Sequence, residues 1–150
     1  MKKLIISAAF IFAAFTSVFA KANNDENKNV VNAFNRMYPH ASTVVWKQVN
    51  DELSIATFNM NGSIMKAVYN ADAELVATSK PVTLKEVPQK ALETINKKYG
   101  DYTIREAIEY NDLVNDAQTC YYFSVENDSK KIILKSNTKG SVEEFKTIYK

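Results

Sequence analysis

Cysteine, histidine, tryptophan, proline and glycine are all scarce in this 150-residue sequence, which has one, one, one, three and three of them. The single cysteine, Cys120, leaves no partner for an internal disulfide, so burial and strand pairing have to stabilise the fold. A nucleophilic thiol would need a base, and the only histidine, His40, lies far earlier in the chain with no pattern that links the two. We therefore expect Cys120 to be an inert thiol in a strand.

Motifs for catalysis and cofactor binding are missing as well. The sequence has no Gly-rich phosphate loop, no Cys-x-x-Cys, no His-Glu-x-x-His and no Gly-x-Ser-x-Gly. Acidic pairs such as Glu143 and Glu144 are adjacent, so in a strand their side chains point to opposite faces instead of converging on one substrate atom. A metal site around one histidine would need several oxygen ligands, and no Asp-x-Asp-x-Asp calcium loop is present. We expect no catalytic residue, no cofactor and no metal site.

Long apolar runs are absent except near the amino terminus. Residues 1–20 begin with a positive charge and continue with an apolar run from Leu4 to Phe15, which is too short to span a bilayer comfortably. These features are typical of a secretory signal peptide, with small residues that predict cleavage after Ala20 or Ala22. The alternative is an uncleaved anchor. We predict a periplasmic or secreted bacterial protein with no membrane span after signal cleavage.

A surplus of one charge is also absent from the predicted mature chain. Loss of the two lysines in residues 1–20 leaves 19 − 2 = 17 basic residues against 17 acidic ones. The long-range field that steers proteins toward nucleic acid is therefore missing, and we expect no nucleic-acid binding. The about 130 remaining residues suffice for one ordinary domain or for two small modules that share a core.

The chain does contain clear local patterns, which start after a polar stretch, residues 21–28, that we predict to be a disordered leader. An apolar stripe at helical spacing then predicts an amphipathic helix, which Pro39 stops at Tyr38. The stripe consists of Val30, Ala33, Phe34 and Met37. Short turn sequences then separate four strand-like segments, as in antiparallel hairpins. These segments lie at about residues 43–49, 53–60, 63–69 and 74–78.

The same order of elements starts again after Pro81. Pro88 suits the start of a second amphipathic helix, and Gly100 suits the position just past its end. Strand-like segments follow near residues 102–110, 119–126, 131–136 and 142–148. The halves align at offsets of 60 to 67 residues; for example, Phe34 matches Ile95 (offset 61) and Phe58 matches Val125 (offset 67).

The alignment predicts a tandem repeat, because self-similarity at a fixed period is typical of repeated structural units. The first unit covers residues 29–80 and the second residues 81–150, with a longer first hairpin near residues 111–117. Each unit is expected to pack a helix on a four-stranded antiparallel sheet, an α+β fold. The only tryptophan, Trp46, and the only histidine, His40, both follow the first helix. The second unit has neither residue there, so this stretch is predicted to be a fold joint, with a solvated His40.

A set of short sequence features recurs at characteristic spacing along the chain: Ala33-Phe34, Tyr38-Pro39, Ala41, Val44-Val-Trp46, Ala56-Thr-Phe58, Asn61-Gly62, Tyr69-Asn-Ala-Asp-Ala-Glu74 and Val87-Pro88. With these features the chain resembles the PepSY-like family of secreted bacterial proteins over nearly all of its mature length. That family is similar in fold to beta-lactamase inhibitory protein, in which two tandem units each place helices against a four-stranded antiparallel sheet. This chain lacks the paired cysteines of that inhibitor and any identifiable enzyme-contacting residues, so the resemblance does not imply inhibition of a beta-lactamase.

Strand alternation points to two candidate partner-binding surfaces. One face of the predicted sheet packs on the helices through Ala56, Phe58, Met65, Ala67, Phe123, Val125, Ile132 and Leu134. The opposite face still carries Leu53, Ile55 and Tyr122, which are apolar where polar residues are usual. Leu113 and Val114 are expected to be exposed at the tip of the longer hairpin. Grouped apolar residues on a solvated surface suggest a contact site. The competing interpretation is that they are ordinary surface hydrophobics or supports for neighbouring strands.

Three functions follow from these patterns. We predict a non-catalytic module that binds an unknown protein or peptide partner and that modulates or inhibits an envelope enzyme. The alternative is a carrier of a small apolar ligand in the concavity of the sheet. An enzyme would require a constellation of residues that no known motif describes.

Overall fold

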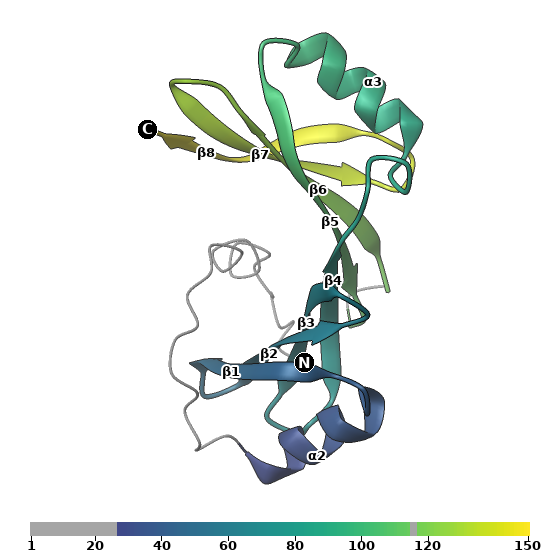
Figure 1. Cartoon of the computed structure of the whole chain (residues 1–150), viewed down its shortest axis with the longest axis vertical. Coiled ribbons are helices and arrows are strands. Elements are labelled where there is room, and N and C mark those ends of the chain that lie inside the picture. Colours follow the sequence, from purple (N-terminus) through teal and green to yellow (C-terminus); the bar gives the residue numbers. More distant parts are fainter. Residues whose placement is uncertain (1–26, 115–116) are drawn as a thin grey trace.

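The computed structural model describes residues 27–114 and 117–150 (Figure 1). The predicted signal peptide, most of the predicted leader, and residues 115–116 of the predicted longer hairpin lie outside the described residues. Along the chain the elements are α2 (Lys28–Met37), β1 (Ser42–Asn50), β2 (Leu53–Met60), β3 (Ser63–Asn70), β4 (Leu75–Pro81), α3 (Gln89–Lys98), β5 (Thr103–Asp112), β6 (Thr119–Glu126), β7 (Lys130–Asn137) and β8 (Val142–Tyr149).

The eight strands form a single antiparallel sheet in the order of the sequence, from β1 to β8. Each predicted strand and both predicted helices are present, so the α+β class is confirmed. The sheet is continuous because β4 pairs with β5, with Ala77 opposite Asp112 and Pro81 opposite Ile108. The two expected four-stranded sheets are therefore halves of one sheet. The descent of both halves from a repeated unit, and the domain boundaries, stay predictions.

The two helices end where local chemistry requires. In α2, the side chain of Asn27 accepts a hydrogen bond from the Asn29 backbone N–H at 2.9 Å, which caps the first turn. The helix ends before Pro39, as the sequence predicts. In α3, Pro88 precedes the first turn, and Lys97 and Lys98 lie in the last turn, where cations favour the negative end of the helix dipole.

Both helices pack on the same face of the sheet, and Figure 1 shows them at opposite ends of the molecule. In the first half, the ring of Phe34 lies 5.3 Å from that of Trp46 and 4.9 Å from that of Phe58. The residues predicted to face the helices do so, because they cluster with buried residues of α2 or α3. They are Ala56, Phe58, Met65 and Ala67 with α2, and Phe123, Val125, Ile132 and Leu134 with α3.

The stretch between α2 and β1 is a structural joint. Trp46 packs against α2, whereas His40 is exposed in the short turn that follows the helix. The positions of the only tryptophan and the only histidine thus agree with the prediction that this stretch connects a helix to a strand.

The other face of the sheet, which no helix of the described chain covers, holds a core of its own. We call it the helix-free face. Its buried cluster draws residues from six consecutive strands, β2 to β7, and therefore joins the two halves of the sheet. The cluster comprises Ile55, Val68, Val76, Ala77, Ile108, Tyr110, Cys120, Tyr122 and Ile133, with Val49 and Leu53 packed against it.

Candidate functional site

The first predicted surface, on the helix-free face, lies where alternation placed it but is not exposed. Ile55 and Tyr122 are only 7% and 3% exposed, and Leu53 is half-buried against the same cluster. The expectation of exposed apolar side chains is therefore wrong for Ile55 and Tyr122, whereas Leu53 is partly exposed.

Neighbouring strands explain this burial. The ring of Tyr122 lies 6.1 Å from that of Tyr110 and 5.3 Å from that of Phe145 on β8, both in edge-to-face geometry. A break in the β7–β8 register falls at Phe145, since Ile133 lies opposite Lys146 whereas Leu134 lies opposite Glu144. Such a bulge re-aims a side chain. Phe145, itself 38% exposed, therefore covers Tyr122.

The second predicted surface, the hairpin tip of Leu113 and Val114, is exposed as expected. Their exposed fractions are 44% and 50%. The backbone around them is held in place, because the Leu113 N–H donates to the Val76 carbonyl at 3.0 Å and the Val114 N–H to Asp112 Oδ1 at 3.0 Å. The structure thus fixes two adjacent apolar side chains in water at the end of β5.

Cys120 belongs to the cluster on the helix-free face. It is buried, and burial raises the pKa of its thiol. A thiol with a raised pKa is a poor nucleophile, because the thiolate is the reactive form. The structure therefore places Cys120 as a packed strand residue.

A buried lysine near the middle of the helix-free face is a feature that the sequence prediction missed. Lys66 is 1% exposed. Burial lowers the pKa of its ammonium group to about 8, while Glu106 raises that pKa and Lys47 lowers it further. Burial in turn raises the pKa of Glu106, against the opposing effects of Lys131 and Lys66. These charges interact across strands that are not adjacent in sequence, so no local pattern reveals them.

Two buried serines flank this pair of charges. Ser79 lies opposite Lys66 in the β3–β4 register, and Ser124 lies opposite Glu106 in the β5–β6 register. Neither serine Oγ has a hydrogen-bond partner among the described residues. Lys66, Glu106 and the two serines therefore form a polar seam inside an otherwise apolar face.

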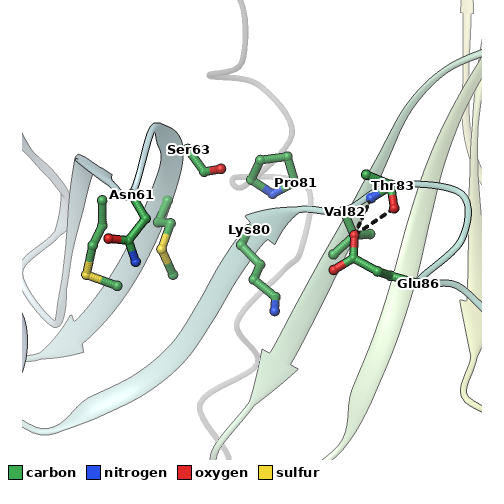
Figure 2. A pocket seen from close by; sticks show the side chains of 9 residues that line it. Asn61, Ser63, Lys80, Pro81, Val82, Thr83 and Glu86 are labelled. Atoms are coloured by element: carbon green, nitrogen blue, oxygen red, sulfur yellow. Dashed lines mark hydrogen bonds between the residues drawn. The ribbon is translucent and has the colours of Figure 1, made fainter.

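A groove of about 560 Å³ opens between the β2–β3 hairpin and the end of β4. Figure 2 shows Asn61 and Ser63 on the hairpin side and Lys80, Pro81 and Val82 on the other. This volume is within the usual range for small-molecule pockets. The complete lining is Met60, Asn61, Ser63, Met65, Lys80, Pro81, Val82, Thr83 and Glu86.

Pro81 explains why the sheet separates here. Among the described residues, pairing between β3 and β4 runs from Tyr69 back to Lys66, opposite Ser79, and stops. The next residue that β4 turns toward β3 is Pro81, which has no N–H to donate to a ladder. The sequence prediction ended this strand near residue 78, whereas β4 continues to Pro81 because its other edge pairs with β5.

The charged groups of the groove already have contacts. Glu86 Oε2 accepts hydrogen bonds from the Thr83 backbone N–H and hydroxyl, both at 2.8 Å, and these bonds lower the pKa of the Glu86 carboxyl. Lys80 Nζ lies 3.6 Å from Glu109 Oε1, an exposed ion pair that contributes little to stability. The Glu86 carboxylate is thus hydrogen-bonded within its own loop. Lys80, by contrast, has a long, exposed ion pair with Glu109 and lies beside the groove.

Within residues 27–114 and 117–150, no group of three or more His, Cys, Asp or Glu side chains is placed to hold a metal ion. No helix in this part of the chain is long and apolar enough to cross a membrane.

The architecture defines a class of proteins, namely a sequential antiparallel sheet backed on one face by helices, and solved structures share it. A Bacteroides eggerthii protein proposed to be periplasmic is 22% identical, with 87% of this chain and 90% of that chain covered and a TM-score of 0.70. A DUF2874 family protein from Bacteroides uniformis is 21% identical, with 83% of this chain and 89% of that chain covered and a TM-score of 0.69. A BLIP-like protein from Bacteroides fragilis is 18% identical, with 83% of this chain and 87% of that chain covered and a TM-score of 0.67.

These likenesses show the fold of the chain. They confirm the expected similarity to beta-lactamase inhibitory protein in architecture, and none of the three descriptions names an enzymatic activity. No family model matches the sequence, and no curated protein matches it. Membership of the PepSY-like family stays a prediction.

Proposed function

We propose that this protein is a non-catalytic module of the bacterial periplasm that binds a protein or peptide partner. The observation that carries the proposal is the fixed exposure of Leu113 and Val114, two adjacent apolar side chains that folding leaves in water. A soluble domain that exposes apolar residues together gains free energy when a partner covers them. Phe145 and Ile148 on β8 are further exposed apolar side chains of the second half.

The fold supports the same conclusion. The similar B. eggerthii protein is proposed to be periplasmic, in agreement with the signal peptide predicted for residues 1–20. We further infer that the chain is a PepSY-like protein of two related halves, residues 29–80 and 81–150, and that its binding modulates an envelope enzyme.

Affinity capture from an envelope extract of the native source tests the proposal. We expect the mature chain to recover at least one discrete partner, and the double variant Leu113→Asp with Val114→Asp to recover at least tenfold less of it. Charged side chains at the tip make its burial against an apolar partner unfavourable.

Lys139→Asp is the matched control. Lys139 is exposed in the turn between β7 and β8, and its replacement changes the net charge by −2, as does the double variant at the tip. Equal recovery by wild type, tip variant and control would exclude the tip as the contact, and recovery of no partner by any of them would contradict the binding function.

A further inference from the structure

We propose that the groove between the β2–β3 hairpin and the end of β4 receives an extended peptide, which adds one short strand to the free edge of β3. The peptide carries an apolar side chain and a carboxylate. This inference deepens the proposed binding function by naming the kind of partner, but it uses a surface at the other end of β4 from the hairpin tip, so each can fail without the other.

The first step concerns the backbone of Ile64. Asn61 and Gly62, with φ of 54° and 78°, form a two-residue hairpin loop between the paired residues Met60 and Ser63. In such a hairpin the flanking pair is hydrogen-bonded and the next residue turns its N–H and C=O to the other side. The N–H and C=O of Ile64 therefore point away from β2 and toward β4, at the edge of the groove that its neighbours Ser63 and Met65 line.

The second step is the lack of a β4 partner for Ile64. Continuation of the register of Lys66 opposite Ser79 would place Pro81 opposite Ile64. Proline cannot donate the second hydrogen bond of that pair, and among the described residues no pairing of β3 with β4 reaches Ile64. Exposed donor and acceptor groups on a strand edge are what an added strand recognises.

The third step concerns side chains. One residue of the bound peptide would lie opposite Ile64. Because side chains alternate along a strand, the peptide residues before and after it would point their side chains to the face that carries Met65 and Lys80. Met60, Met65 and Val82 line the groove with apolar surface, and methionine adapts to apolar groups of different shape. Lys80 supplies the positive charge, since Glu86 is bound to Thr83. An apolar side chain and a carboxylate complement this lining.

Hydrogen exchange of the Ile64 amide tests the proposal directly. The probes are octapeptides selected on the mature protein from a random display library, and decanoate is the comparison probe, because it has an apolar tail and a carboxylate but no peptide unit. We expect the Ile64 amide to exchange rapidly in the free protein and at least tenfold more slowly at saturation with a selected peptide. Decanoate is expected to leave that exchange rate unchanged.

Two variant pairs test the contacts. Ile64→Pro removes the N–H that faces the groove but none that pairs with β2, and we expect at least a tenfold rise in peptide Kd. Ile64→Val keeps the N–H and is expected to stay within twofold of wild type. Lys80→Gln should weaken peptides that contain an acidic residue three- to tenfold, and Lys80→Arg should not.

Several results would overturn the proposal. They are the selection of no peptide, peptide binding that leaves Ile64 exchange unchanged, an equal Kd for wild type and a folded Ile64→Pro variant, and decanoate binding that is as tight as peptide binding. The last result would indicate a carrier of apolar carboxylates. If the selected peptides bind the double variant Leu113→Asp with Val114→Asp as tightly as wild type, peptide binding in the groove does not depend on the tip.

Discussion

At the scale of single residues, Lys66 departs most from ordinary protein chemistry. An ammonium group in the interior loses hydration, and the attraction of Glu106 compensates only in part, so the pKa of Lys66 falls to about 8. The strand pattern correctly assigns Lys66 to the helix-free face. It does not predict burial, because burial depends on the packing of that face across several strands, which a local pattern does not contain.

The depressed pKa of Lys66 predicts a pH-dependent stability. Below pH 8 the lysine is charged in both states, and between about pH 8 and 10.5 the unfolded chain binds the proton that the folded chain has released. Stability therefore rises with pH in this window, by up to about 3 kcal/mol. We expect urea unfolding of wild type to show this rise relative to Lys66→Met.

Lys139→Met is the control, because Lys139 is exposed in the turn between β7 and β8, is not among the groups that shift the pKa of Lys66, and should leave the rise intact. If the free energy of unfolding changes identically with pH between 8 and 10.5 in wild type and in Lys66→Met, Lys66 is not a buried cation.

Gly140 gives a second prediction at this scale. It has a φ of +81°, and a Cβ there would lie 2.7 Å from Lys90 Cβ and 2.9 Å from the Ala91 backbone nitrogen at the start of α3. Gly140→Ala therefore combines backbone strain with a clash against a helix, and we expect a loss of about 2 to 4 kcal/mol in urea unfolding.

Gly62→Ala separates the two effects. Gly62 has a φ of +78° but no heavy atom within 4 Å of a Cβ, so only the strain of about 1 kcal/mol applies. Equal losses at Gly62 and Gly140 would show that the contact between the β7–β8 turn and α3 is unimportant.

At the scale of elements, local sequence predicts strands and helices well. Alternation and turn residues such as Asn61 and Gly62 act over a few positions, so the β2–β3 hairpin was predictable at both strand boundaries that it joins. The true end of β4 was not, because its last residues are held by pairing with β5, a strand almost thirty residues further along. Long-range pairing thus overrides the local signal at Pro81.

Replacement of Pro81 tests the origin of the groove. Pro81→Val restores an N–H that can donate to the Ile64 carbonyl, so we expect the β3–β4 ladder to gain one residue pair and the groove to narrow. The measurement is hydrogen exchange of the Ile64 amide without peptide, which should slow about tenfold or more. An unchanged rate in a folded variant would mean that something other than proline separates the strands.

At the scale of the whole molecule, one sheet and the cluster on its helix-free face connect both halves. Ile55 of β2 and Tyr122 of β6 share this cluster, although each half also has its own helix-covered core. The sequence predicted which residues share a face, but not that Phe145 covers Tyr122, since that contact needs the bulge in β8. The expected exposure of Tyr122 was wrong for this reason, whereas the tip of Leu113 and Val114 is exposed as expected.

The connected cores predict cooperative unfolding. Leu134 is buried in the core of the second half, and Leu134→Ala should cost about 2 to 5 kcal/mol. Trp46, the only tryptophan, lies in the first half. We expect its fluorescence midpoint in urea to shift with the far-UV circular dichroism midpoint, because both halves unfold together. A Trp46 transition that the variant does not move would show independent halves.

The measurement that tests the central claim most directly is photo-cross-linking in intact periplasm, with a photoreactive amino acid at position 113 and, as the control, at position 139. A binding function through the apolar tip predicts one or more discrete protein adducts from position 113 and none from position 139. An absence of adducts from position 113, or the same adducts from both positions, would contradict it.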